Sequence, residues 1–394
     1  MRTDRAMAGA RALALALVWF AQSAAHGADA PRLRMTLAGA PQTLFDTRTD
    51  RCAPEDMPDI NARAIRTRTG VALFALHYTA RAMRGPDLDH LKLDCAPALQ
   101  SHESDDPALY DGRRYIASLW TRDGVNVAAL VHNEYHAEIH AGRCATSDAM
   151  SCWWNAIVAF RSHDGARHFE PTGDIVAATP FRQNFDQTRH RGFFNPSNMI
   201  AKGAYVYAFA STTGWTGQNY GACLFRNKDP LNSAGWRGWD GREFTARWDD
   251  PYRTDAPRQS TCAPIEPFAL PVGALVRHRA SGLFVAVWEA GVWAGRYERS
   301  GFYYATSPDL IDWSAPALLQ AGGVSHQPCG EKNRYRDDVT IAYPSIIDPD
   351  AEGENFDNIG NEAWLYYARI RNEGCNAAGE RTLVREKIRL SPAR

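Results

Sequence analysis

The chain has 394 residues, of which 45% are hydrophobic and 23% are charged, a balance typical of a globular protein and not of a disordered one. Its formal net charge of -1 provides no field that would attract nucleic acid or an anionic membrane, so neither partner is expected. Aromatic residues make up 11% of the chain. Abundant Trp and Tyr favour a β-rich fold, and their rings also suit contact with the apolar face of a sugar.

The first predicted element is an export signal. Arg2, Arg5 and Arg11 precede an apolar run at 12–21 that is too short to span a membrane. Small residues follow this run, and we expect the signal to cover residues 1–28. No later run is long and apolar enough to insert into a membrane. The mature chain is therefore expected to be secreted or periplasmic.

All eight cysteines follow the predicted signal, and an even number in an exported chain predicts disulfide bonds. Spacing does not fix the partners, but we expect each cysteine to pair with the next, because each such pair falls within one candidate repeat. No C-x-x-C motif is present, which argues against a thiolate zinc site. The eight are Cys52, Cys95, Cys144, Cys152, Cys223, Cys262, Cys329 and Cys375.

The rest of the chain is rich in strand signals and poor in helix signals. Short apolar runs with β-branched and aromatic residues alternate with turns that contain Gly, Asp, Asn or Pro. A strand, a polar turn and a second strand recur along the chain, which indicates a repeat. The five predicted hairpins combine 60–66 with 71–77, 115–120 with 125–131, 198–201 with 204–211, 274–278 with 283–288, and 344–347 with 362–368.

Most of these hairpins are followed by a third strand with a shared ending. At 156–171, 222–236 and 301–316, a strand leads to Ser or Asn, then to Asp, then to an aromatic residue. One such unit cannot bury both of its faces, so the units must stack around an axis. We predict an all-β fold, a five-bladed β-propeller of four-stranded antiparallel blades that forms one domain at 40–392. The alternative is a pair of β-sandwiches, but that fold would not need five similar units.

Two segments carry a resemblance to a known group. YYATSPDLIDWSAP at 303–316 and the closing pattern at 342–369 resemble the five-bladed propeller glycosidases, the arabinanase, xylosidase and levansucrase group. This resemblance implies cleavage of a glycoside at a pocket on the propeller axis by acidic residues from different blades. The chain departs from the group at MPDINARA, where a His-Asp-Pro opening is missing, and at Asn195-Pro196, where many members carry Asp-Pro. Either the acidic set is rearranged or the protein only binds its ligand.

The propeller geometry predicts which residues share one pocket. Residues just before the first strand of a blade and just after its second strand lie on the same rim. The substrate-binding residues expected there are His77, His132, Asn133, His136, Asn195, Trp215, Trp288 and Tyr343.

Glycoside hydrolysis requires two carboxyl groups, one acting as acid and one as base or nucleophile. Glu134 is the first candidate for the acid, because a partly buried Glu between His132 and His136 would have a raised pKa. Glu289 is the second catalytic candidate. Asp59 is the expected base, because its position is similar to that of the opening-blade Asp in the group that the chain resembles.

The stretch from His132 to His140 has His or Glu at every second position. On a strand these side chains share one face, and imidazole with carboxylate suits Zn²⁺, so a metal-dependent hydrolase is one alternative function. Alternate residues lie about 6.8 Å apart on a strand, so only neighbours could chelate, and no metal is expected. The acidic turn at 348–357 is followed by Ile359 where a calcium loop of the EF-hand type requires Glu. A structural calcium ion there stays open beside a plain solvated turn.

Together these observations predict an exported carbohydrate-active protein, a glycoside hydrolase that acts as a monomer on an oligo- or polysaccharide. No cofactor is established by the sequence. The second alternative is a non-catalytic propeller that binds a glycan or a partner in the cell envelope.

Overall fold

The computed structural model describes residues 29, 32–292, 295–325, 339–372 and 379–393. Over these residues the chain consists almost entirely of β-strands, which confirms the prediction of an all-β fold. Within the described ranges α1 (Ala149–Cys152) is the one α-helix, and η1 (Pro107–Leu109), η2 (Ala137–Ile139) and η3 (Ser233–Gly235) are short 3-10 helices. None of these helices has the length and hydropathy needed to span a bilayer. The predicted export signal lies outside the described residues.

The five predicted hairpins are present as antiparallel strand pairs. Four pairs are joined by a short turn or loop and the fifth by the longer segment 348–361, and most of their strands are dominated by buried residues, as expected where both faces of a strand are covered. The pairs are β3 (Pro58–Thr67) with β4 (Gly70–Leu76), β7 (Arg113–Thr121) with β8 (Val127–His136), β12 (Ile200–Lys202) with β13 (Tyr205–Thr212), β17 (Ala274–His278) with β18 (Phe284–Ala290), and β22 (Val339–Ile347) with β24 (Glu362–Arg371).

Two further antiparallel strands extend each pair. They are β5 (Arg81–Gly85) and β6 (Lys92–Pro97), β9 (Trp153–Ser162) and β10 (Glu170–Ala177), β14 (Gly221–Asn227) and β15 (Arg237–Trp239), β19 (Gly301–Ser307) and β20 (Ala317–Ala321), and β25 (Arg381–Pro392) and β1 (Leu33–Leu37). The last set joins the two ends of the chain, because β1 pairs with β25. β1 also lies before residue 40, where the sequence predicts the domain to begin.

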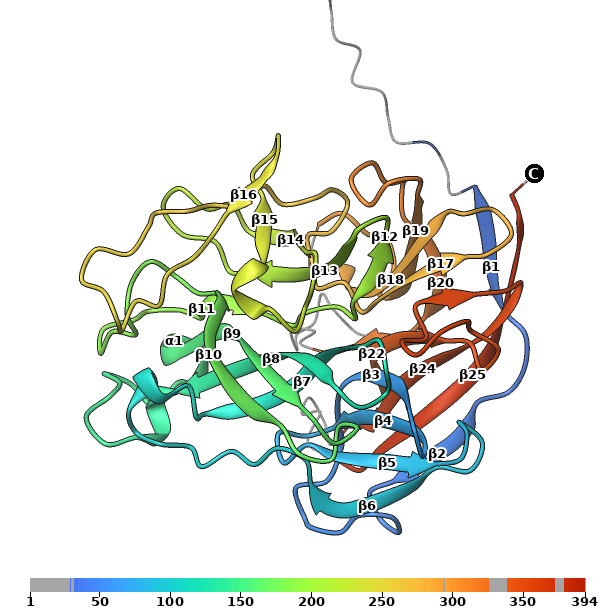
Figure 1. Ribbon diagram of the computed structural model, residues 1–394, viewed down its shortest axis with the longest axis horizontal. Coiled ribbons are helices and arrows are strands. Elements are labelled where there is room, and N and C mark those ends of the chain that lie inside the picture. Colours follow the sequence, from blue (N-terminus) through green and yellow to red (C-terminus); the bar gives the residue numbers. More distant parts are fainter. Residues whose placement is uncertain (1–28, 30–31, 293–294, 326–338, 373–378, 394) are drawn as a thin grey trace, which may run out of the picture.

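The remaining strands link or lengthen these sets. β11 (Arg191–Phe194) pairs with both β9 and β13 and so joins two sets into one ten-stranded sheet. β2 (Gln42–Asp46), β16 (Phe244–Ala246), β21 (Gly323–Val324) and β23 (Asn358–Ile359) add to the edges of the sheets. In Figure 1 the sets follow one another in sequence order around the middle of the molecule, and β1 lies beside β25 at the right.

Hydrophobic side chains pack in clusters between successive sets of strands, and the two-residue period of each strand sorts them. In β8, Val131 belongs to the cluster shared with β3–β5, whereas its neighbour Leu130 belongs to the cluster shared with β13 and β14. In β24, Tyr366 and Tyr367 divide in the same way between two clusters. β8 and β24 are therefore buried on both faces, which explains why their sequences contain nearly continuous apolar runs.

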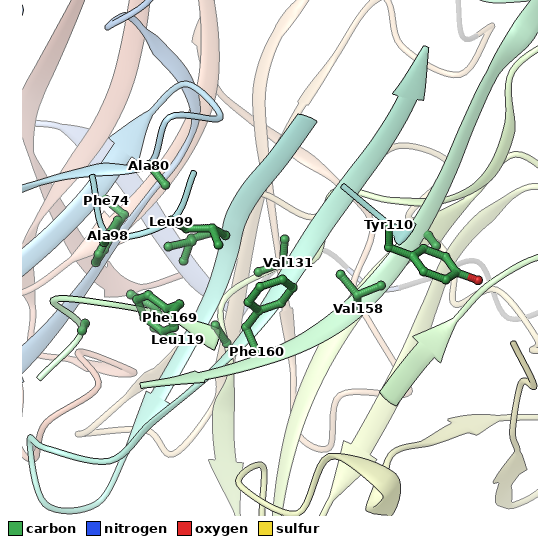
Figure 2. Packing of buried hydrophobic residues seen from close by; sticks show 14 of the residues in the cluster. Phe74, Ala80, Ala98, Leu99, Tyr110, Leu119, Val131, Val158, Phe160 and Phe169 are labelled. Carbon is green, nitrogen blue, oxygen red and sulfur yellow. The ribbon is translucent and has the colours of Figure 1, made fainter. Parts of the chain in front are cut away.

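Figure 2 shows one of these clusters, in which Phe74 and Leu99 lie on one side and Val131, Val158 and Phe160 on the other. The rings of Phe74 and Phe169 meet edge to face, with centroids 6.1 Å apart. Aromatic rings in such edge-to-face contacts stabilise a core beyond the effect of area alone, by about 1 kcal/mol a pair.

Polar side chains join the first strands of the hairpins to one another. The buried Arg63 of β3 donates from Nε to the carbonyl oxygen of Ala117 at 2.5 Å and from its terminal nitrogens to Ser345 Oγ at 2.8 Å and the carbonyl oxygen of Pro196 at 3.2 Å. Asn198 exchanges two hydrogen bonds with the backbone of Leu275, at 2.8 and 2.7 Å. These contacts hold strands from distant parts of the chain together in the middle of the molecule.

The disulfides Cys52–Cys95, Cys144–Cys152 and Cys223–Cys262 confirm three of the four expected pairs. Cys329 and Cys375, the fourth expected pair, lie outside the described residues. Each observed disulfide ties a loop or outer strand to a neighbouring segment of the chain.

Candidate functional site

A cavity of about 710 Å³ lies where the hairpins converge. Its walls come from the start of β3 and β7, the ends of β8, β13 and β18, and the middle of β22, so distant parts of the sequence meet there. Among the residues that the sequence predicts for the site, those that line this cavity are Asp59, His77, His132, Glu134, His136, Asn195, Glu289 and Tyr343. All three carboxyl candidates therefore face one space.

Three expected substrate-binding residues lie elsewhere. Asn133 is fully buried and accepts a hydrogen bond from the Gly112 amide at 3.2 Å. Trp288 is fully buried in the core, where its Nε1 donates to the Tyr297 hydroxyl at 3.1 Å. Both alternate along a strand with a cavity residue, so they point the opposite way, and this placement does not fit the role expected for them. Trp215 lines a neighbouring cavity instead.

Asp59, near the start of β3, is the most heavily bonded of the three carboxyl groups. Its Oδ1 accepts a hydrogen bond from the Tyr343 hydroxyl at 3.0 Å, and its Oδ2 accepts one from the Tyr115 hydroxyl at 3.2 Å. Arg381 forms an ion pair with Oδ1, and His77 Nε2 lies 3.3 Å from Oδ2. Burial lowers the pKa of His77 more than the neighbouring Asp59 charge raises it, which favours the neutral imidazole.

Glu289, at the end of β18, has a different environment. Burial raises its pKa to about 7, although hydrogen bonds from Ser325 Oγ and from the Tyr343 amide at 3.2 Å act in the opposite direction. Desolvation disfavours the charged carboxylate and is the larger effect here. Glu289 can therefore carry a proton near neutral pH.

Tyr343 connects two of the carboxyl groups. Its hydroxyl donates to Asp59 and its backbone amide donates to Glu289. Its φ of +58° is in the left-handed region, which is uncommon for a bulky residue, and it lies at an irregularity in the pairing of β22 with β24. The irregularity turns both donors of one residue toward the cavity. Asn195, which directly follows β11 (Arg191–Phe194) and also lines the cavity, has a positive φ of +45° as well.

Glu134 lies near the end of β8, which is longer than the sequence predicts and extends through His136. Because alternate residues share a face, His132, Glu134 and His136 all reach the cavity. Glu134 Oε1 lies 3.6 Å from His132 Nδ1, and Oε2 lies 3.2 Å from His136 Nε2. Burial raises the pKa of Glu134, whereas the contact with His136 lowers it by a smaller amount.

The two imidazoles beside Glu134 differ in character. Burial lowers the pKa of His132 to about 3, and its Nε2 accepts a hydrogen bond from Asn155 Nδ2 at 2.6 Å. This neutral ring leaves Nδ1 as the nitrogen that donates toward Glu134. His136 instead lies between two carboxyl groups, since its Nδ1 is 3.0 Å from Glu138 Oε1. Each ring nitrogen of His136 thus faces a carboxyl oxygen.

An aromatic wall lies beside this group. Trp153 stacks on His136, with ring centroids 5.0 Å apart, and on His190, with centroids 4.2 Å apart. All three side chains line the cavity. His140 does not, because it follows η2 and stacks on Tyr135 at 5.3 Å. The alternating stretch thus contributes its first half to the site.

No group of three or more His, Cys, Asp or Glu side chains in the described ranges converges closely enough to hold a metal ion. In the acidic turn, Asp348 accepts hydrogen bonds from the amides of Asp350 and Gly360 and pairs with Arg279 at 3.2 Å. The side chain of Asp348 therefore stabilises the turn itself. These arrangements give no support to the metal-dependent alternative or to a calcium site.

Several cavity residues are absent from the sequence-based set. Arg113 and Tyr115 stand at the start of the second hairpin, so the same positional rule that selects Asp59 could have found them. Arg381 comes from the start of β25 and His190 from the loop before β11, and neither position carries a signal in the sequence.

Neither the protein-family models nor the curated proteins contain a match to this chain. The structure is distantly similar to solved structures of glycoside hydrolases. An α-L-arabinanase from Cellvibrio cellulosa, solved with arabinohexaose, is 12% identical with a TM-score of 0.46, over 84% of this chain and 92% of that one. A β-fructofuranosidase from Bombyx mori is 11% identical with a TM-score of 0.44, over 84% and 62% of the two chains. A protein of unknown function from Dyadobacter fermentans is 11% identical with a TM-score of 0.45, over 92% and 100%.

Proposed function

We propose that this protein is a glycoside hydrolase whose active site is the cavity that contains Asp59, Glu134 and Glu289. The observation that carries the proposal is the meeting of three carboxyl groups from three different hairpins in one cavity of about 710 Å³. The pKa is raised in two of them and the third is held in an ion pair. Carboxyl groups whose environments separate their protonation behaviour are what glycoside hydrolysis requires.

The scaffold in this proposal is a five-bladed propeller at 33–392. Five four-stranded sets follow one another along the chain, and five hydrophobic clusters lie between successive sets. The fifth cluster combines Phe45 and Tyr366 with Ala62 and Leu73, so the last set packs against the first. A single blade has two apolar faces, and this arrangement covers both faces of every blade.

In the proposed reaction Glu289 is the general acid. A carboxyl group with a pKa of about 7 carries a proton for the leaving oxygen and can release it in the reaction. Asp59 is the opposing carboxylate, which acts on water or on the anomeric carbon while Tyr115, Tyr343 and Arg381 hold it in place. This assignment moves the acid from Glu134, the first candidate in the sequence, to Glu289.

Glu134 has a supporting role in this proposal. Its contacts with His132 and His136 place a third titratable group on the cavity wall, and its charge state changes the field at Asp59. Trp153 and Tyr115 provide flat surfaces in the same wall. A sugar ring bound there can place its apolar face on a ring and its hydroxyl groups on the polar side chains.

The proposal is tested with the mature protein and a panel of polysaccharides and 4-nitrophenyl glycosides. Glu289→Gln is expected to lower kcat on natural glycosides by at least about 100-fold, with a smaller loss on aryl glycosides, whose leaving group needs no proton. Asp59→Asn is expected to lower kcat on both kinds of substrate by a similar factor. Release of sugar is measured by chromatography.

Asp357→Asn is the matched control. Asp357 is also a shielded carboxyl group with a pKa raised by burial, but it bonds to the Ala201 amide outside the cavity. Its replacement is expected to leave kcat within about twofold. A wild-type protein that binds glycans of the panel but hydrolyses none of them would contradict the hydrolase and support the non-catalytic alternative.

We further propose that the chain is exported and acts as a monomer. Three disulfides, which form in oxidising compartments, support export. Secretion of the full-length chain with removal of residues 1–28, followed by mass spectrometry and light scattering, tests both statements.

A further inference from the structure

A second cavity of about 500 Å³ adjoins the first one. Thr188 and Arg189 line both cavities, so the two spaces are neighbours along the loop that precedes β11. The carboxyl groups discussed above lie in the first cavity and none of them lines the second. A ligand longer than one sugar residue that occupies the first cavity can therefore extend into the second.

The walls of the second cavity include two aromatic rings. Phe181 and Trp215 meet edge to face with centroids 5.9 Å apart, and the buried Phe193 supports Trp215 from behind at 5.6 Å. Phe181 is 36% exposed, and Tyr220, on the wall of the first cavity, is 50% exposed. Large exposed rings beside a cavity are suited to contact with the apolar faces of sugars.

The same cavity carries positive charge. Arg182, Arg189 and Arg191 line it, whereas Asp186 is the one acidic side chain among its described lining residues. Arg182 is engaged, since it donates to the carbonyl oxygen of Pro251 at 2.7 Å and pairs with Asp255 at 3.0 Å.

Arg189 and Arg191 differ from Arg182, because no carboxylate in the described part of the chain lies within ion-pair distance of either. Arg191 donates a hydrogen bond to the carbonyl oxygen of Gly214, at 3.5 Å. Burial lowers the pKa of Arg191, and the charge of Arg189 lowers it further. Two arginines on the wall of one cavity thus have no carboxylate partner among the described residues.

We infer that this second cavity is a subsite for an acidic sugar residue of the substrate, one that carries a carboxylate or a sulfate group. A planar guanidinium donates two parallel hydrogen bonds to either anion, and a partly buried one such as Arg191 gains most from a bound negative charge. Trp215 and Phe181 provide the contact for the sugar ring. The inference rests on the proposed function, which it extends from glycosides in general to acidic glycans.

The test is binding rather than hydrolysis. Affinities of the mature Glu289→Gln protein are measured by calorimetry for a tetragalacturonate, a hyaluronan tetrasaccharide and a sulfated carrageenan tetrasaccharide, each beside its methyl-esterified or desulfated form. At least one acidic glycan is expected to bind at least about tenfold more tightly than its neutral form, and the preference should decrease with added salt. Which acidic member binds distinguishes carboxylate from sulfate.

The arginines are then replaced. Arg189→Gln with Arg191→Gln is expected to remove at least about tenfold of the affinity for the acidic glycan and to change that for the neutral form by less than twofold. Arg68→Gln, which removes one positive charge from the exposed turn between β3 and β4, is expected to leave both affinities unchanged. Trp215→Ala should weaken the binding of both the acidic and the neutral glycan, whereas Trp215→Phe should retain most of the wild-type affinity for both.

The inference is overturned if no acidic glycan binds more tightly than its neutral form, or if Arg68→Gln has the same effect as the double replacement. Hydrolysis of neutral glycans alone, without charge preference in binding, would contradict the subsite and leave the hydrolase standing. Arginine-dependent binding without any hydrolysis by the wild type would contradict the hydrolase and leave the subsite standing.

Discussion

At the scale of single residues, the cavity shows how burial and partners give different properties to carboxyl groups that share one space. Asp59 has two tyrosine hydroxyls and an arginine as partners, whereas Glu289 has a serine hydroxyl and one amide. Among the described residues, no positive charge pairs with Glu289 to offset its desolvation. Its raised pKa follows from this difference.

This pKa predicts how stability depends on pH. Glu289 titrates at about 7 in the folded protein but at its ordinary, lower value when unfolded, so the folded state binds more protons between these two values. Stability from this group is fully present below the ordinary pKa of Glu and is lost as pH rises through about 7. Relative to Glu289→Gln, the wild type should lose on the order of 3 kcal/mol between pH 4 and pH 8.

Denaturant unfolding of both proteins at a series of pH values measures this difference. Asp357→Asn, whose carboxyl pKa is also raised by burial, is a useful second comparison outside the cavity. A stability difference between wild type and Glu289→Gln that stays constant with pH would show that Glu289 has an ordinary pKa.

At the scale of elements, the end of β8 determines which side chains reach the cavity. Directly after His136 the chain leaves the strand and enters η2, so Glu138 contacts His136 from the side and His140 turns toward Tyr135. The segment then returns through Cys144, which is bonded to Cys152 immediately before β9. We call the loop closed by this disulfide, residues 144–152, the clip. Asp148 and Met150 lie within the clip and Trp153 directly follows it, and all three line the cavity.

Opening the Cys144–Cys152 disulfide should therefore affect function more, and stability less, than opening Cys223–Cys262. The loop closed by Cys144–Cys152 spans 8 residues and that closed by Cys223–Cys262 spans 39. In the chain-entropy treatment their removal costs about 2.5 and about 4 kcal/mol respectively. We expect replacement of Cys144 and Cys152 by Ser to raise KM at least about fivefold because the wall beside His136 loosens.

The same replacement of Cys223 and Cys262 is the matched comparison, because these sulfurs lie in a hydrophobic cluster. It should lower the free energy of unfolding more and raise KM less than replacement of Cys144 and Cys152 does. Thermal unfolding and steady-state kinetics are compared for the two double variants. Equal KM for both would show that the clip does not shape the cavity.

At the scale of the whole molecule, the site depends on contacts between strands that are far apart in the chain. Arg63 is 3% exposed and bonds to residues 54, 133 and 282 positions away. Burial lowers its pKa to about 9, so the guanidinium remains charged at neutral pH. Its hydrogen bonds to the carbonyl oxygens of Ala117 and Pro196 must offset this desolvation.

Replacement of Arg63 by Met should therefore destabilise the protein. Two buried carbonyl oxygens would lose their partner, which costs about 1 to 3 kcal/mol each, while the removed charge no longer has to be desolvated. We expect a net loss of about 2 to 3 kcal/mol in the free energy of unfolding. Arg68→Met, at an exposed turn of the same hairpin, should change it by less than about 0.5 kcal/mol.

Urea unfolding followed by Trp fluorescence measures both variants. Equal stability of Arg63→Met and the wild type would mean that the free-energy cost of burying the charge equals the gain from its hydrogen bonds. The middle of the molecule would then be stabilised by apolar packing alone.

The sequence by itself determined the strand pairs, because each strand is a short apolar run and each turn has its own Gly, Asp or Asn signal. It left the cysteine pairing open, but the expectation that each cysteine pairs with the next is confirmed for three disulfides. It also placed Asp59, Glu134 and Glu289 near the ends of strands, and the repeated hairpins bring these ends to the same cavity.

Only the tertiary structure decided which of these residues meet and what they bond to. Asn133 and Trp288 were one residue out of register with the cavity, and a shift of one position on a strand turns a side chain to the opposite face. Arg381 and His190 reach the cavity from β25 and from a loop, at positions that no local pattern marks. The raised pKa of Glu289, finally, follows from burial, and Asp59 meets Tyr343 from 284 residues away, so both environments exist only in the folded chain.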